Sequence, residues 1–269
     1  MSVFAKKYQN HSVFKLINEI SENYNFFSYS SFNHLNLHLS LTTNIDSIIF
    51  SSLKGTLNSI NDILKVGRIN DAFSLLRKYY EGVIIDIYKS AYIKEKYTNL
   101  SFDYAEQIEK WCKGEKELPQ YSKMIKYLQR VKCLEKIRPF YDIQEKGFYD
   151  KIKMKCNENL HYNKLGYMLL NNSDYYVENR EQYLTLIHKY ISAIFEFHMA
   201  CLFILHPEYW IASDYIDALE CGCTPKENSQ YWISPAGQQM FNKLWGNKPQ
   251  IAELLKKESN IIFEEEINL

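Results

Sequence analysis

The chain has 269 residues, of which 46% are hydrophobic, and its 32 basic and 32 acidic side chains give a formal net charge of zero at pH 7. This composition excludes an intrinsically disordered chain, and the zero net charge excludes a global attraction to nucleic acid or anionic membranes. The 9 glycines and 6 prolines are too few for an all-β protein with many tight turns and favour long helices.

The first predicted elements are a helix and a short strand. Apolar residues from Phe14 to Tyr24 recur at helical spacing and predict a helix that ends near Asn23. In residues 35–41, leucines alternate with polar residues, which is the two-residue period of a half-buried strand. Leucine lacks β-branching, so a helix is the alternative for this segment.

The next two elements form a predicted helical hairpin. Residues 46–66 carry a continuous apolar stripe, and Gly67 is suited to cap the end of this helix. A second long helix is predicted from an N-cap at Asn70 or Asp71 to about Lys96. The short break between the helices makes them antiparallel neighbours.

Two shorter helices are predicted to follow. The first occupies residues 101–114 and begins with a capping serine. Pro119 opens the second, which continues through Cys133 or Ile137 until Pro139 stops it.

A long apolar helix is predicted from Glu178 to His206, where Pro207 terminates it. Its most apolar part, residues 190–206, is about 17 residues long and contains charged and imidazole side chains. A membrane span needs about 20 apolar residues, so we expect a buried core helix and no membrane association.

The sequence divides into a helical bundle domain, residues 1–206, and a C-terminal appendage, residues 207–269. The appendage is rich in aromatic residues and contains four prolines, which indicates loops lying over the bundle. Residues 260–269 are a candidate terminal strand, which would form one small strand pair with residues 35–41.

Residues 156–167, "CNENLHYNKLGY", form the most polar aromatic stretch. Asn157 and His161 are one helical turn apart and share a face, as do Asn159 and Asn163. Asparagine is a poor helix-interior residue, so this stretch suggests a helix beginning here, with Asn157 or Asn159 as its cap. That structural interpretation explains one asparagine and leaves the other polar residues unexplained. For His161 the structural alternative also stays open, because a lone histidine is more often structural than catalytic.

The same residue types also suit RNA cleavage. Histidine acts as a general acid or base near neutral pH, and His161 is the candidate here. Amides, the phenol of Tyr162 and the ammonium of Lys155 can orient a phosphate and stabilise its developing negative charge. Residues 123–155 carry ten basic and four acidic side chains, which is either a solvated helix face or a surface for an anion.

Arg77 lies on an apolar ridge of its predicted helix and therefore needs a partner. The structural interpretation is an internal pair with Glu81, four residues later. The functional interpretation is that Arg77 points into a cleft and holds an anion such as phosphate through its planar fork.

The cysteines indicate a reducing compartment. Six cysteines follow no disulfide-framework spacing, and residues 1–25 lack the features of a secretory signal, so we predict a cytoplasmic location. Cys221, Cys223 and His206 supply three of the four ligands of a zinc site at non-standard spacing, so no metal is predicted. Phosphate-binding glycine loops and other cofactor motifs are missing, so no cofactor is predicted either.

The run "SLLRKYYEGVIIDIY", followed about 80 residues later by "NENLHYN", resembles the HEPN-like superfamily. Within it, the chain looks like helical proteins that accompany bacterial abortive-infection and other anti-phage loci. The resemblance covers residues 46–206 and implies an up-and-down helical bundle that often forms dimers. Active members are metal-independent endoribonucleases with an Arg-x(4–6)-His motif at the dimer cleft.

The chain departs from this motif. Lys155 stands where the arginine before His161 would be, and Arg180 and His188 are too far apart to replace the pair. Arg77 would therefore have to supply the guanidinium from another helix, or the protein would not cleave RNA.

The sequence thus predicts an all-α, HEPN-like bacterial defence protein, a toxin-type endoribonuclease acting on RNA. The predicted catalytic residues are His161, Arg77 and Lys155, and the predicted substrate-binding residues are Asn157, Asn159, Tyr162, Asn163 and Glu81. The predicted partners are RNA, a second copy of the chain, and an antitoxin or another defence component. The alternative is a non-catalytic interaction or sensor protein that binds a protein partner or a small anion.

Overall fold

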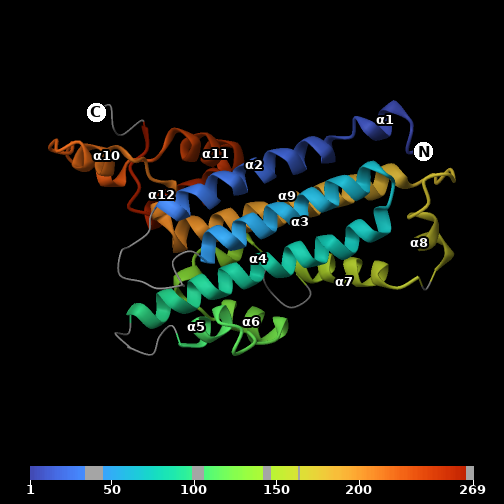
Figure 1. Cartoon of the computed structure of the whole chain (residues 1–269), viewed down its shortest axis with the longest axis horizontal. Helices are drawn as coiled ribbons and strands as arrows, with labels where there is room; N and C mark the ends of the chain where they lie inside the picture. Colours follow the sequence, from blue (N-terminus) through green and yellow to red (C-terminus); the bar gives the residue numbers. More distant parts are fainter. Residues whose placement is uncertain (34–44, 99–105, 142–146, 163, 265–269) are drawn as a thin grey trace.

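The computed structural model describes residues 1–33, 45–98, 106–141, 147–162 and 164–264, and the chain forms an all-α helical bundle. A short helix, α1 (Lys6–Gln9), precedes it. Each neighbouring pair of long helices packs together in the cyclic order α2, α3, α4 and α9, so the four enclose one core. Figure 1 shows these helices side by side: α2 (Ser12–Asn33), α3 (Ile45–Lys65), α4 (Ile69–Thr98) and α9 (Arg180–Leu205).

The predicted hairpin of α3 and α4 is confirmed. Gly67 adopts a φ of +80°, the left-handed conformation that ends many helices, and its N–H donates to the carbonyl of Leu64. The N-cap prediction was wrong, because α4 begins at Ile69. Asn171, from far along the chain, accepts the backbone N–H of Asp71 at 3.1 Å and so occupies the capping position.

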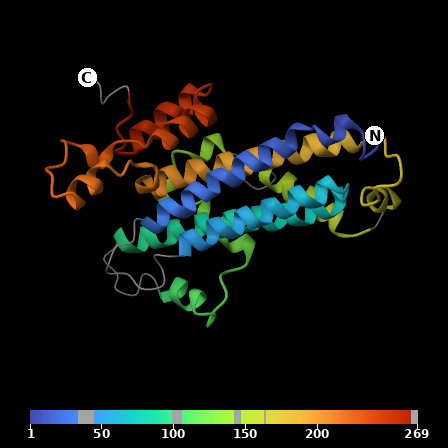
Figure 2. The same cartoon turned by 45° about the horizontal axis from the view of Figure 1, so that its top comes forward.

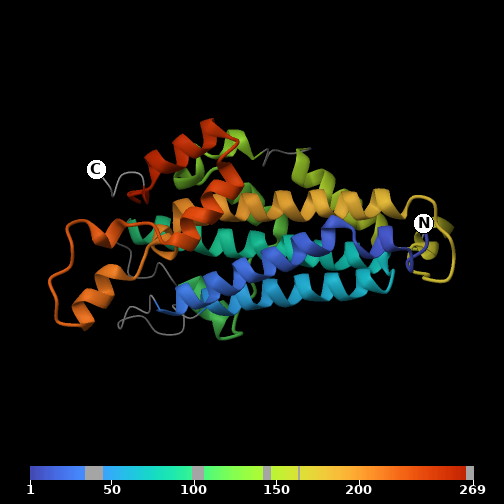
Figure 3. The ribbon, with the colours of Figure 1, turned by 90° about the horizontal axis from the view of Figure 1, so that it is seen from above.

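The long helices that follow one another in the chain run in alternating directions. After α4, the chain passes through α5 (Glu106–Cys112) and α6 (Tyr121–Leu128) and returns along α4 as α7 (Phe148–Leu160). The short helix α8 (Leu165–Leu169) then leads towards α9, which ends beside α4, where Lys94 Nζ donates to the carbonyl of Ile204 at 2.7 Å. Figure 3 shows α7 and α9 along the same side of the bundle.

Two predicted helix ends were wrong. Helix α2 continues to Asn33 instead of ending near Asn23, because Tyr24 and Phe27 prolong its buried face. The helix predicted from Pro119 ends at Leu128 and is followed by two short 3₁₀ helices, η1 (Lys132–Leu134) and η2 (Arg138–Phe140).

The side chain of Arg138 lies at the point where the helix after Pro119 ends. The guanidinium of Arg138 donates to the backbone carbonyls of Gln129 and Val131, which α-helical hydrogen bonding would otherwise use. Val131 itself has extended dihedrals, with φ −60° and ψ 127°. The helical hydrogen-bond ladder therefore ends at this point.

The C-terminal segment contains more helix than predicted. It comprises η3 (Pro207–Trp210), α10 (Asp214–Glu220), η4 (Ser229–Tyr231), α11 (Pro235–Trp245) and α12 (Pro249–Glu258). Figure 2 shows these helices gathered at one end of the bundle. The buried apolar side chains of the C-terminal segment, Trp210 and Trp245 among them, belong to the same hydrophobic cluster as those of the long helices.

Residues 260–264, the described part of the predicted terminal strand, contain an isolated β-bridge, and residues 265–269 lie outside the described residues. Ile262 pairs with Trp232 in parallel, and Ile211 pairs with Ile233 in antiparallel orientation. Residues 35–41, the predicted partner, lie outside the described residues.

Helix α9 forms the centre of the core. Fifteen of its residues are buried, among them Ile194, Phe197 and Phe203. It is the one described helix that is long and apolar enough to cross a membrane, but 67% of the relevant window is buried inside the bundle. Core helices of soluble proteins have these same properties, and the burial agrees with the predicted core helix.

A buried ionic network crosses the core near the C-terminal ends of α4 and α9. Lys89 Nζ, on a side chain that is 1% exposed, donates to Oδ1 of Asp86 at 3.0 Å and to Oδ1 of Asp46. The phenol of Tyr209 donates to the other oxygen of Asp46 at 2.5 Å. Burial lowers the pKa of Lys89 to about 7, with Cys112 and Glu208 acting in the opposite direction. The ammonium form is the one that both carboxylates contact. The ion pairs therefore favour the charged ammonium.

The network continues from Asp86 through a fully buried histidine. Nε2 of His198 lies 2.8 Å from Oδ2 of Asp86, and Nδ1 lies 2.9 Å from the hydroxyl of Tyr24. Tyr24 in turn lies 2.9 Å from the hydroxyl of Tyr79. Every polar group is satisfied if Tyr79 donates to Tyr24, Tyr24 donates to Nδ1, and Nε2–H donates to Asp86. The network joins all four long helices to η3.

Candidate functional site at the end of α7

Helix α7 presents one buried face and one exposed face. Ile152, Cys156 and Asn159 point into the bundle, whereas Asn157 and Glu158 are exposed. Burial raises the pKa of the Cys156 thiol to about 12, with nearby Arg77 acting in the opposite direction. Cys156 is therefore a protonated packing residue and not a nucleophile.

The polar stretch is the end of a helix, which corrects the prediction of a helix start. Asn157 and Asn159 lie in the last turn of α7, and His161 follows it in an extended conformation, with φ −122° and ψ 138°. Asparagine is tolerated there because the hydrogen-bond ladder ends within the same turn. Asn157 and Asn159 are thus not N-caps.

Arg77 reaches the exposed face of α7. Its Nη1 donates to Oδ1 of Asn157 at 2.6 Å, and its Nε donates to Oε1 of Glu81 at 3.0 Å. The Arg77 side chain is 31% exposed, and its Nη2 has no hydrogen bond to a described residue. The predicted pair with Glu81 is therefore confirmed, and Arg77 also contacts the polar stretch through Asn157. The predicted anion contact of Arg77 stays a prediction.

Lys155 belongs to a neighbouring ion pair. Its Nζ lies 2.9 Å from Oε2 of Glu158, an oxygen that also accepts from the phenol of Tyr167 at 3.4 Å. Burial lowers the pKa of Lys155, but the hydrogen bond and the charge of Glu158 outweigh burial and raise it overall. The ammonium also lies 5.9 Å from the ring centre of Tyr183. Lys155 is thus suited to stabilise charge rather than to release a proton.

Asn159 has a structural position. It is 1% exposed, accepts a hydrogen bond from Nδ2 of Asn70 at 2.9 Å, and donates to the carbonyl of Lys155 at 2.8 Å. Its amide is therefore committed to the packing of α7 on α4, and the predicted contact with a phosphate is not supported by its orientation.

Residues beyond His161 are attached to α4 through one asparagine. Nδ2 of Asn171 donates to the hydroxyl of Tyr162 at 2.7 Å and to Oδ1 of Asp71 at 2.7 Å. Asn159 is fixed to Asn70 on the other side of His161. His161 itself is exposed and makes no hydrogen bond with the described residues, so its chain position is held while its imidazole remains available.

The structure thus brings some of the predicted residues together and separates others. Arg77, Glu81 and Asn157 form one cluster, whereas Lys155 has its own partner, Glu158. No described contact joins His161 to Arg77, and Asn163 lies outside the described residues.

Sequence reasoning missed Glu158 and Asn171, two residues that organise this face. Glu158 was detectable, since it follows Lys155 by three residues on the same helix face. Asn171 had no such signal, because it acts across 100 residues of sequence.

The cluster is electrically balanced, with Arg77 opposite Glu81 and Lys155 opposite Glu158. An arginine carries five N–H donors in a planar fork, and only two are used here, so the guanidinium can bind a phosphate oxygen while keeping its present partners. The described residues contain no group of three His, Cys, Asp or Glu side chains that could hold a metal ion.

Comparisons with protein-family models, with curated proteins and with solved structures found no significant match.

Proposed function

We propose that the chain is a HEPN-like bacterial defence protein that binds RNA on the α4–α7 face and cleaves it without a metal ion. The observation that carries the proposal is the contact between Arg77 and Asn157, because it brings a guanidinium from α4 to the helix that ends at His161. This contact supports a guanidinium supplied from another helix, in place of the arginine that the sequence motif lacks.

The residue types suit transesterification of RNA. His161 removes the proton of a 2′-hydroxyl, the 2′-oxygen attacks the phosphorus, and the bond to the 5′-oxygen breaks. The products are a 2′,3′-cyclic phosphate and a 5′-hydroxyl. Arg77 and Lys155 stabilise the negative charge of the transition state.

A second copy of the chain completes this proposal. The departing 5′-oxygen needs a proton, and the raised pKa of Lys155 makes its ammonium a weak donor. An imidazolium is in general a stronger acid than an ammonium, and the imidazole of His161 from the second copy fills this role in a dimer. Exposed apolar side chains near His161 favour such an interface: Met154, Leu165 and Met168 are 63%, 70% and 47% exposed.

Cleavage of a single-stranded RNA in EDTA tests the catalytic proposal. We expect the His161→Ala variant to lose cleavage while it retains RNA binding, and the Arg77→Lys variant to lose most cleavage because Lys lacks the planar fork. His188→Ala, on α9, is the matched control and should cleave normally. Equal cleavage by wild type and His161→Ala, or no cleavage by either, would refute catalysis.

The second candidate function is a non-catalytic interaction protein. It is favoured by the pairing of Arg77 and Lys155 with glutamates, which weakens their attraction for an anion. Sedimentation of Leu165→Glu tests the interface, with Leu219→Glu on α10 (53% exposed) as the control. A dimer that persists only in the control, together with absent cleavage, would select this second function.

A further inference from the structure

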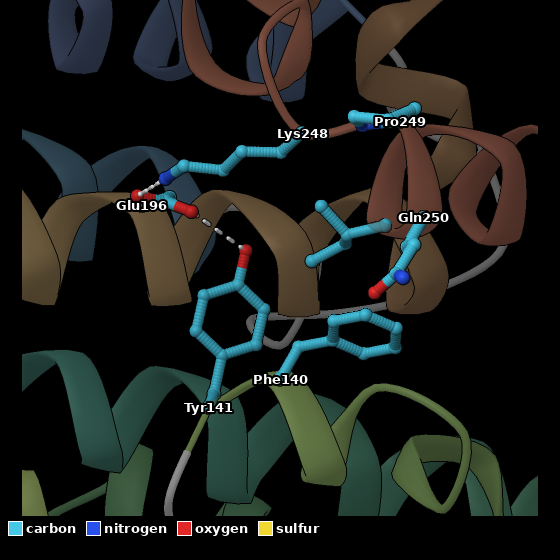
Figure 4. Close-up of a pocket in the computed structure, with 7 residues that line it drawn as sticks. Phe140, Tyr141, Glu196, Lys248, Pro249 and Gln250 are labelled. Atoms are coloured by element: carbon cyan, nitrogen blue, oxygen red, sulfur yellow. Dashed lines mark hydrogen bonds and ion pairs between the residues drawn. The ribbon is translucent and has the colours of Figure 1, made fainter.

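A cavity of about 460 Å³ lies where the C-terminal helices meet the bundle, between α9, the residues after η2 and the start of α12 (Figure 4). This volume falls in the range of small-molecule sites. We call it the Glu196 pocket, and it is lined by Phe140, Tyr141, Glu196, Lys248, Gln250 and Ile251 among others. It shares no lining residue with the α4–α7 site, which comprises Arg77, Asn157 and His161 with their partners.

The carboxylate of Glu196 is held in a fixed orientation. The phenol of Tyr141 donates to Oε1 at 3.3 Å, and Nζ of Lys248 lies 2.6 Å from Oε2. Nε1 of the fully buried Trp245 donates to the hydroxyl of Tyr141 at 3.0 Å and so sets the direction of its O–H. A carboxylate positioned through such a relay is preorganised for a ligand that donates hydrogen bonds.

The charge of the pocket favours a neutral group, such as a base, for the part of a ligand that enters it. Among its lining residues are one carboxylate and one ammonium, which balance each other, so neither a phosphate nor a free amine is favoured. A carboxylate offers about four acceptor positions and an ammonium three donors, and their contacts with each other and with Tyr141 use only some of these. The Lys248 side chain is 49% exposed, so it can move towards a ligand.

The pocket has an exposed aromatic side chain at its edge. Phe140 is 41% exposed at the edge of the pocket, and Figure 4 shows its ring beside that of Tyr141, with Gln250 opposite. Exposed aromatic side chains stack on nucleobases, because every base has a flat π-face.

We propose that the Glu196 pocket binds a guanine base. Guanine is the nucleobase whose Watson–Crick edge has two adjacent donors, N1–H and the 2-amino group, followed by an acceptor, O6. Glu196 accepts from both donors, and Lys248 donates to O6. The corresponding edges of adenine, cytosine and uracil each have one donor and would place an acceptor against the carboxylate.

The bound guanine base can belong to a free guanine nucleotide or to a single-stranded RNA. The inference does not depend on the α4–α7 proposal, because it rests on different residues. If RNA is the source, the pocket would read one base of a strand. If a nucleotide is the source, the pocket would sense the nucleotide directly.

Titration calorimetry with three nucleotides tests the base preference. We expect the wild-type chain to bind guanosine monophosphate with a Kd on the order of 0.1 mM. Inosine monophosphate, which lacks the 2-amino group, should bind about tenfold more weakly, equivalent to 1.4 kcal/mol. Adenosine monophosphate should not bind measurably. Equal binding of guanosine and adenosine nucleotides, or no binding of any, would overturn the proposal.

Matched variants assign the binding to this pocket. Glu196→Gln replaces one acceptor with a donor and should weaken guanosine monophosphate binding at least about tenfold. Glu19→Gln is the control, since Glu19 also bridges the bundle to the C-terminal segment, with Lys243 Nζ at 2.7 Å. It should bind normally, and unchanged binding by Glu196→Gln would overturn the assignment.

Two further arms keep the test decisive. Phe140→Ala alters an exposed side chain, so it should fold normally and lose the stacking contribution, and this distinguishes loss of the site from loss of the fold. An oligoadenylate carrying one guanine, compared with plain oligoadenylate, distinguishes RNA from free nucleotide as the source. Normal binding by a folded Phe140→Ala variant would contradict the stacking geometry.

Discussion

Replacing Lys89 with methionine is predicted to destabilise the protein strongly. Methionine has a similar length but no charge, so the variant keeps the packing and leaves the carboxylates of Asp86 and Asp46 facing each other. These two residues are 0% and 6% exposed, so water cannot solvate them. Removing one partner of a buried ion pair lowers the free energy of unfolding by about 3–5 kcal/mol.

The surroundings hold the cost within that range. Asp86 keeps its hydrogen bond with His198 at 2.8 Å, and Asp46 keeps that from Tyr209 at 2.5 Å. For a chain somewhat longer than 250 residues, 1 kcal/mol corresponds to a shift in Tm of about 2–4 °C, so Tm should fall by roughly 6–20 °C. Urea denaturation at pH 7, followed by circular dichroism, gives the free energy of unfolding directly.

Two comparisons separate charge from packing. Lys65→Met alters a surface lysine that is 52% exposed and should change the free energy of unfolding by less than about 0.5 kcal/mol. The triple variant Asp46→Asn, Asp86→Asn, Lys89→Met removes the buried charges and should recover part of the loss. A Lys89→Met variant within about 1 kcal/mol of wild type, or a triple variant less stable than Lys89→Met, would refute this reasoning.

Three other predictions concern stability. Asn159→Ala leaves the buried amide of Asn70 unpaired and should lower the free energy of unfolding, measured by urea denaturation, by about 1–3 kcal/mol. A decrease below about 0.5 kcal/mol would contradict the pairing. Gly67→Ala should cost at least about 1–2 kcal/mol, because φ is +80° and the new Cβ would lie 2.5 Å from a methyl carbon of Val3; an unchanged Tm would contradict it. Burial raises the pKa of Tyr8 from 10.0 to about 12, so its contribution to stability is complete below pH 10 and is lost as pH rises to 12. Helical circular dichroism should therefore fall between pH 10 and 12, and Tyr8→Phe should lessen this loss; an equal loss in the wild type and Tyr8→Phe would contradict this.

The bundle was predictable because helical periodicity is a local property of the sequence. The apolar stripe of α3 and the glycine after it specify one helix and its end, and α9 is apolar over most of its length. The long helices and the α3–α4 hairpin needed no knowledge of distant residues. Helix ends were less predictable, as after Leu128, where Arg138 donates to carbonyls several residues earlier in the chain.

The organisation of the α7 site was only partly predictable. Asn157 and Asn159 suit either end of a helix. In the structure they lie at the end of α7, where their side chains contact Arg77 and Asn70 on α4. The pair of Arg77 and Glu81 was visible from its four-residue spacing. The additional contact with Asn157 spans 80 residues and had no local signal.

The buried ionic network was not predicted for the same reason. Its members come from four long helices and η3, and each is a single polar residue in an otherwise helical pattern. Only Asp86 and Lys89, three residues apart, gave a local indication of a pair. Burial of both became visible only once the bundle placed them beside Asp46 and His198.

The two polar regions of the bundle have opposite physical characters, and this difference bears on where function resides. In the core network, Lys89 and its partners are buried and mutually satisfied, so a ligand from solvent has no access to them. At the end of α7, the side chain of Asn159 bonds to Asn70 before His161, the hydroxyl of Tyr162 bonds to Asn171 after it, and His161 itself is exposed. A rigid support beneath an accessible titratable group is what catalysis requires, since a loosely held group loses its alignment with the reacting atoms. His161 therefore meets the requirement of access that His198 fails, even though His198 has the more extensive hydrogen bonding.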